Sequence, residues 1–165
     1  MVCCLTLEWL ALGVWVGGIL ILIGAVIPAV FNTFGGQDTG GFFLTRTFEG
    51  YNRFVMGALA VLSASAWYRW WSGYSAMQVT RGELWLLAAM GLIAGVIILW
   101  LHPQAAMLQA QAFAAKDETA RKAAFEAFFR LHMPVRSLYM VNLVLGIALM
   151  GLKVKWSLRW SQVSA

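Results

Sequence analysis

Two histidines are the residues whose type and position most favour a bound cofactor. His102 follows one long apolar stretch and His132 precedes another, so both are expected on the same side of a membrane. Paired imidazoles ligate b-type haem, and Met107 and Met133 lie near them in sequence as soft ligands for copper. The simpler interpretation is a pair of interfacial histidines bonded to headgroups or backbone. We therefore expect no cofactor, with haem b or copper on His102 and His132 as the alternatives.

The two cysteines, Cys3 and Cys4, are neighbours near the start of the chain. Adjacent cysteines rarely pair with each other, so we interpret them as thiols at the membrane interface, with palmitoylation or a metal contact as alternatives. They are expected on the opposite membrane side from the histidines, so one metal site cannot use both sets. The chain contains no HExxH, GxSxG or phosphate-loop pattern, and we expect no enzymatic activity.

The composition excludes most soluble protein classes. Of the 165 residues, 61% are hydrophobic and only 12% are charged, with a mean hydropathy of +0.74. These values exclude a disordered chain and a disulfide scaffold and argue against a soluble enzyme. The net charge of +5 comes from residues at the ends of apolar stretches or in one connecting segment, which favours lipid headgroups over nucleic acid as the partner.

Apolar stretches long enough to cross a bilayer occur at residues 9–31, 54–71, 84–101 and 134–152. The sequence therefore predicts an all-α, single-domain membrane protein, a four-helix bundle. The connection at residues 103–132 is rich in alanine, with Asp117 as an N-cap, and predicts an extended helical hairpin between the third and fourth spans. Met133-Pro134 predicts a break in the second helix of this hairpin.

The segment between the first two spans, residues 32–50, carries Gly35, Gly36, Gly40 and Gly41 and is expected to be flexible or re-entrant. An even number of spans places both termini on one side. Basic residues directly follow the fourth span, which favours cytoplasmic termini in a bacterial inner membrane: Lys153, Lys155 and Arg159.

Small residues at helical spacing indicate where the spans pack. Gly13 and Gly17 form one such pair and Gly91 and Gly95 another, within the bundle or against another subunit. Asn142 lies well inside the fourth span and is expected to bond to another helix, with a ligand contact as the alternative. No charge lies at the centre of any predicted span, which argues against a proton-coupled carrier and an ion channel with a charged filter.

These residues also carry a resemblance. The segments LGVWVGG and PAVF in the first span, FEGY before the second and FFRLH before the fourth resemble the transmembrane-protein-205-like family, also described as a bacterial domain of unknown function. The resemblance implies a four-span protein without an established catalytic activity. The positions that match the family pattern are Pro28, Phe48, Tyr51, His132, Ser137 and Asn142. Met133-Pro134 departs from it. Trp15-Val16-Gly17-Gly18 is also similar, more weakly, to copper-resistance D-type membrane proteins.

The function expected from these observations is a small accessory or scaffold protein. Its partners would be the lipid bilayer and either a second copy or the subunits of a larger membrane complex. The alternatives are a haem-binding redox protein that uses His102 and His132, and a protein that handles copper or another metal through Cys3 and Cys4 or through Met107 and the histidines.

Overall fold

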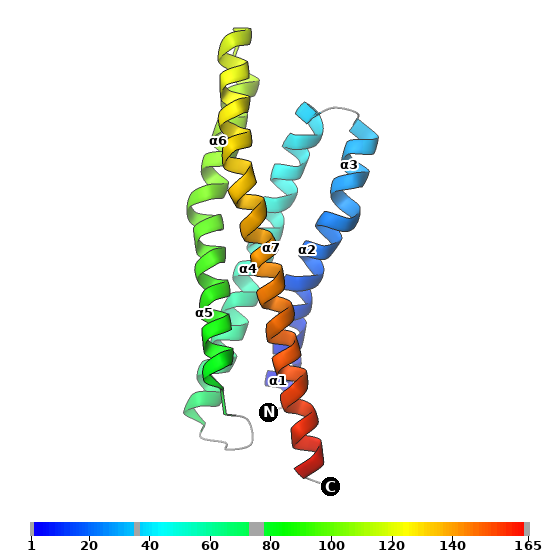
Figure 1. Cartoon of the computed structure of the whole chain (residues 1–165), viewed down its shortest axis with the longest axis vertical. Coiled ribbons are helices and arrows are strands. Elements are labelled where there is room, and N and C mark those ends of the chain that lie inside the picture. Colours follow the sequence, from blue (N-terminus) through cyan, green and yellow to red (C-terminus); the bar gives the residue numbers. More distant parts are fainter. Residues whose placement is uncertain (1, 35–36, 73–77, 164–165) are drawn as a thin grey trace.

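The computed structural model describes residues 2–34, 37–72 and 78–163, and every regular element among them is helical. The predicted all-α class is therefore confirmed for these residues. Figure 1 shows the helices side by side along one long axis, with both ends of the chain at the same end of the molecule.

The first helical run consists of five segments that follow one another without a break. Two of them are π-helical turns, in which the wider winding rotates the following side chains around the helix axis. In chain order the run is α1 (Val2–Leu12), η1 (Gly13–Gly17), α2 (Gly18–Ile21), η2 (Leu22–Val26) and α3 (Ile27–Phe34).

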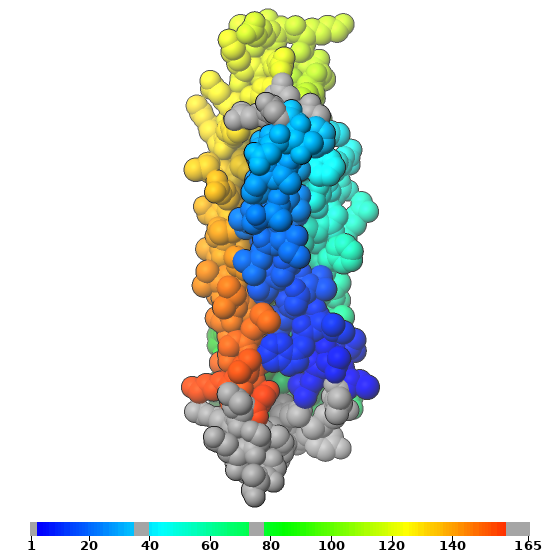
Figure 2. All heavy atoms as spheres, turned by 90° about the vertical axis from the view of Figure 1, so that its right-hand side faces the viewer, coloured from blue at the N-terminus to red at the C-terminus, as the bar shows by residue number. Residues whose placement is uncertain are grey.

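The remaining helices are α4 (Gln37–Trp71), α5 (Arg81–Val96), η4 (Ile97–Leu101), α6 (His102–Ala114) and α7 (Glu118–Val163). α5, η4 and α6 form one continuous run that turns back into α7. The tip of the α6–α7 hairpin projects beyond α3 and α4 (Figure 1). Figure 2 shows the first helical run lying between α7 on one side and α4 on the other.

Three helical stretches are long and apolar enough to cross a membrane: Cys3–Phe34, Arg81–Ala114 and Glu118–Ser157. They contain the first, third and fourth predicted spans. α4, which contains the second, does not reach the same hydropathy over 18 residues. It carries Glu49, Arg53 and Arg69 along its length.

The buried positions of the long helices recur at alternating steps of four and three residues. On α7 they are Val135, Tyr139, Asn142, Gly146, Leu149 and Lys153. On α4 the same spacing gives Tyr51, Val55, Ala58, Leu62, Ser65 and Arg69. This period places one stripe of each helix against its neighbours at a shallow crossing angle. The interior is apolar along most of its length but carries charged residues at one end.

The predicted flexible connection at residues 32–50 is wrong over most of its length. α4 begins at Gln37, so the greater part of this segment is helical. Gly35 and Gly36 lie outside the described residues, as does the side chain of Arg159.

Close packing explains the glycines at the start of α4 better than flexibility does. A side-chain carbon added at Gly40 would lie 3.2 Å from Val30 Cγ1, and one added at Gly41 would lie 3.2 Å from Gln109 Nε2. Thr45 Oγ1 donates to the Gln109 side chain at 2.6 Å and fixes α4 against α6. Glycine at Gly40 and Gly41 allows this close approach of the helices.

The predicted break at Met133-Pro134 is also wrong, because α7 continues through Pro134. A membrane helix tolerates the missing N–H of proline where neighbouring groups satisfy the surrounding backbone. Leu131 and Val135, one on each side of the proline, both pack in or against the core, and Ser137 Oγ donates to the Met133 carbonyl at 3.1 Å. Packing on both sides of the proline therefore keeps the helix continuous.

Candidate functional site

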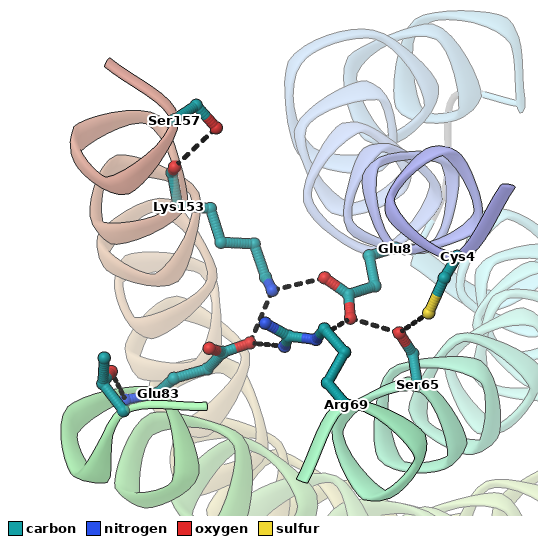
Figure 3. Close-up of polar contacts among 8 residues, drawn as sticks. Cys4, Glu8, Ser65, Arg69, Glu83, Lys153 and Ser157 are labelled. Carbon is teal, nitrogen blue, oxygen red and sulfur yellow. Dashed lines mark hydrogen bonds and ion pairs between the residues drawn. The ribbon is translucent and has the colours of Figure 1, made fainter. Parts of the chain in front are cut away.

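Four buried charged side chains meet where the helices come together near the chain termini (Figure 3). Lys153 Nζ lies 2.6 Å from Glu8 Oε2 and 2.5 Å from Glu83 Oε1. Arg69 Nε lies 2.9 Å from Glu8 Oε1, and Arg69 Nη2 contacts Glu83 Oε1. Each acid thus contacts both bases and each base contacts both acids. We call this closed arrangement of Glu8, Arg69, Glu83 and Lys153 the ion ring.

Each member of the ion ring comes from a different helix, and the antiparallel order of the helices brings them to one level. Glu8 lies on α1 and Lys153 lies on α7, near the two ends of the chain. Arg69 is in the last turn of α4 and Glu83 is in the first turn of α5. Thr80 caps α5 by accepting the backbone N–H of Glu83 at 3.1 Å, which fixes the start of that helix.

The ion ring extends toward the chain start through two uncharged side chains. Ser65 Oγ donates to Glu8 Oε1, and the Cys4 thiol lies 2.7 Å from Ser65 Oγ. Because the hydroxyl hydrogen of Ser65 is directed at the carboxylate, its oxygen is left to accept from the thiol. Cys3 is exposed and takes no part in this chain of contacts.

Because the ion ring is buried, its stability depends on the presence of all four charged residues. Glu8 is 1% exposed and Lys153 is 9% exposed, so little water reaches either group. Two acids and two bases give the ring no net charge. Removing a single member of a buried ion pair leaves an uncompensated charge, at a cost of about 3–5 kcal/mol. The ring is therefore suited to fixing the positions of four helices relative to one another.

A second polar group lies farther along the interior and combines aromatic rings with amides. The Tyr51 hydroxyl donates to the Trp15 carbonyl at 2.7 Å, and the Tyr139 hydroxyl donates to Asn52 Oδ1 at 2.8 Å. The rings of Phe48 and Tyr139 lie 5.2 Å apart.

Asn142 lies on the same stripe of α7 and donates from Nδ2 to the Met90 carbonyl at 3.4 Å. This contact joins α7 to α5, as expected for an interhelical amide. We call Phe48, Tyr51, Asn52, Tyr139 and Asn142 the aromatic–amide cluster.

The two histidines lie on the two arms of the α6–α7 hairpin and have different surroundings. The His132 ring stacks on Phe128 with 5.5 Å between centroids, and its residue is exposed. His102 is half-buried at the start of α6. Met107 and Met133 are both exposed on the hairpin. Among the described residues, no group of three or more histidine, cysteine or acidic side chains is placed to hold a metal ion.

The predicted small-residue pairs have different surroundings. A carbon added at Gly13, Gly17 or Gly95 would meet nothing within 4 Å, whereas one at Gly91 would lie 3.2 Å from Leu59 Cδ1.

The tightest glycine contacts are at two positions that the pairs do not include. A carbon at Gly18 would lie 2.7 Å from Tyr51 Cε2, and one at Gly146 would lie 2.7 Å from Val16 Cγ2. Pro28 is exposed near the start of α3.

The sequence contains a signal for the ion ring at the ends of the predicted spans. A search for charges at the span centres alone does not detect it. The charged residue nearest to the end of each predicted span that faces the chain termini is an acid in two spans and a base in the other two: Glu8, Arg69, Glu83 and Lys153. If the four predicted spans alternate in direction, these ends lie on the same side. Opposite charges at one depth are expected to pair.

Comparison with known proteins identifies a family for most of the chain. Residues 10–114 match the model of DUF4149, a domain of unknown function. This range contains Arg69 and Glu83 of the ion ring, whereas Glu8 and Lys153 lie on either side of it. No curated protein and no solved structure matches the chain. Because the match covers more than half of its length, the chain belongs to the DUF4149 family of membrane-type domains.

Proposed function

We propose that this chain is a non-enzymatic membrane protein that serves as an accessory or scaffold subunit. The observation that carries the proposal is the closed ion ring, in which every charge has two opposite neighbours. Such a ring favours fixed helix positions, because releasing any one ion would break two contacts at once. A fixed set of helices presents a constant surface to a partner in the membrane.

The proposal takes α4 as a fourth span over residues 54–71, which completes a four-helix bundle. α4 packs against the first helical run through Tyr51 and Ser65, while Phe54 and Met56 on its outer side are exposed and apolar. An exposed apolar face on a long helix suits contact with lipid tails.

The proposed orientation places the ion ring on the cytoplasmic side of a bacterial inner membrane. Lys155 lies at that end and is exposed. Basic residues are in excess at the cytoplasmic ends of membrane helices, so Lys155 favours a cytoplasmic location for this end. Cys3 is exposed and adjoins Cys4, which contacts Ser65 beside the ion ring, so a membrane-impermeant maleimide should label Cys3 in inside-out vesicles but not in right-side-out vesicles. Labelling from the outer side would contradict this orientation.

The proposed partner is another membrane subunit that contacts the outer side of the first helical run. Gly13 and Gly17 have no atom within 4 Å of their added carbons, so another helix can approach closely there. The test is cross-linking in native membranes, followed by purification. A stoichiometric partner should be recovered with the wild-type chain and with Lys155→Met, and less of it with Lys153→Met, which opens the ion ring. A solitary monomer would contradict the proposal, and a cross-linked second copy would identify self-association.

The proposed role uses no cofactor, so protein purified in mild detergent should be colourless. The measurement is the visible absorption spectrum, first oxidised and then reduced with dithionite. A Soret band with a sharpened α-band on reduction would overturn the proposal and favour haem on His102 and His132. Stoichiometric copper in an elemental analysis would overturn it in favour of metal handling.

We also propose that the chain is related more closely to the transmembrane-protein-205-like proteins. It rests on the positions that match their pattern, of which Phe48 and Tyr51 lie in the aromatic–amide cluster. A structural role for these two side chains is consistent with an accessory function without catalysis.

A further inference from the structure

The aromatic–amide cluster contains two buried amides that are each only partly satisfied. Asn52 and Asn142 are both 4% exposed. Asn52 Oδ1 accepts from Tyr139, and Asn142 Nδ2 donates to the Met90 carbonyl. The other atom of each amide, Asn52 Nδ2 and Asn142 Oδ1, has no hydrogen-bond partner within the described chain.

The two remaining atoms are a donor and an acceptor, Asn52 Nδ2 on α4 and Asn142 Oδ1 on α7. Tyr139 and Asn142 are three residues apart on the buried stripe of α7, so their side chains lie on one helix face. Tyr139 holds Asn52 against this face through its hydroxyl. A donor of α4 and an acceptor of α7 are thus left in the same part of the interior.

Rotating either amide does not resolve the problem. A rotated Asn142 would direct Oδ1 at the Met90 carbonyl, which is itself an acceptor. A rotated Asn52 would offer its amino group to the Tyr139 hydroxyl and leave Oδ1 without a donor. Because a buried polar group without a partner is costly, a further hydrogen-bonding group is needed at this position.

We propose that a buried water molecule bridges these two amides. The water accepts a hydrogen bond from Asn52 Nδ2 and donates one to Asn142 Oδ1. Waters retained in protein interiors make two to four such bonds to polar groups that lack other partners. The site is separate from the ion ring, because Gly146 and Leu149 follow on the α7 stripe before Lys153. The proposal does not depend on the accessory role.

The chain offers a direct spectroscopic test, because its only asparagines are Asn32, Asn52 and Asn142. The full chain would be labelled with ¹⁵N-asparagine, placed in lipid nanodiscs and studied by water-edited solid-state NMR. Magnetisation from water should reach the Asn52 amino group in the wild type. It should be lost in Asn142→Leu, which removes the acceptor that holds the water. Exposed Asn32 gives the positive control, and Val144→Leu on the outer side of α7 gives the matched variant.

Two results would overturn the water site. One is the absence of water transfer to Asn52 in the wild type while Asn32 gives a strong signal. The other is unchanged transfer in Asn142→Leu. If that variant does not fold, a high-resolution structure of the wild type decides the question. Density within hydrogen-bond distance of both amides supports the water, and a dry interior there excludes it.

Discussion

Lys153 Nζ lies 2.6 Å from Glu8 Oε2, and this contact joins the last helix to the first across 145 residues of chain. Both groups also contact the other oppositely charged residue of the ion ring. The contact therefore completes a ring of ion pairs that joins four helices, not only two. Its energetic importance follows from burial, since little water reaches a lone charge here to replace its partner.

Lys153→Met should destabilise the protein strongly, because it leaves two buried carboxylates with only Arg69 as a counter-charge. The expected loss is about 3–5 kcal/mol of the free energy of unfolding. Thermal unfolding in detergent, followed by tryptophan fluorescence, measures it. Lys155→Met is the control, because Lys155 is exposed and close in sequence. Equal melting temperatures for the two variants would contradict a structural role for the ion ring.

Combining Glu8→Gln with Lys153→Met should cost less than the sum of the two single substitutions. The double variant removes one acid and one base, and leaves Arg69 paired with Glu83. A coupling energy of about 0.5–3 kcal/mol is expected for groups in one ion network. Strictly additive effects in the double-mutant cycle would show that the two charges act independently.

Gly18→Ala should destabilise the packing of the first helical run on α4. The added carbon would lie 2.7 Å from Tyr51 Cε2, so the aromatic ring must move. Overpacking of this kind costs about 1–3 kcal/mol. Gly17→Ala is the matched control, because a carbon there meets nothing within 4 Å. Comparison of the two melting temperatures tests whether the Tyr51 ring lies where the structure places it.

Tyr51→Phe should remove one interhelical hydrogen bond while keeping the ring. The lost bond runs to the Trp15 carbonyl in the π-helical turn η1, and the expected cost is about 1 kcal/mol. Tyr68→Phe changes the same chemical group at an exposed position and should have little effect. A larger effect for Tyr68→Phe than for Tyr51→Phe would argue against the buried contact.

The tip of the α6–α7 hairpin should become less ordered in acid. Hydrogen bonds from the Thr119 hydroxyl and the Ala120 N–H lower the pKa of Asp117. A carboxyl group with a lowered pKa in the folded state contributes stability above its unfolded pKa. That contribution is lost as the pH falls below about 4 and through the lowered pKa. Hydrogen exchange at residues 118–121 should quicken over this range, and Asp117→Ala should exchange quickly already at neutral pH.

The sequence indicates the helical class and three of the spans because these depend on local composition. Long apolar stretches favour helices in a membrane whatever their partners are. The cap at Asp117 is equally local, since its side chain bonds to a backbone group three residues away. The start of α4 was not predictable in this way. Gly40 and Gly41 suggest flexibility from sequence alone, and the residues that pack against them, Val30 and Gln109, lie on other helices.

The ion ring separates what the sequence determines from what the tertiary structure determines. The sequence by itself places Glu8, Arg69, Glu83 and Lys153 near the ends of the four predicted spans that face the chain termini. Only the tertiary structure decides that all four side chains point inward at one level, because this depends on the rotation and register of four separate helices. The same register brings Tyr139 to Asn52 and leaves Gly13 and Gly17 facing outward. Composition determines that the chain enters a membrane, and the relative placement of its helices determines which polar groups meet inside it.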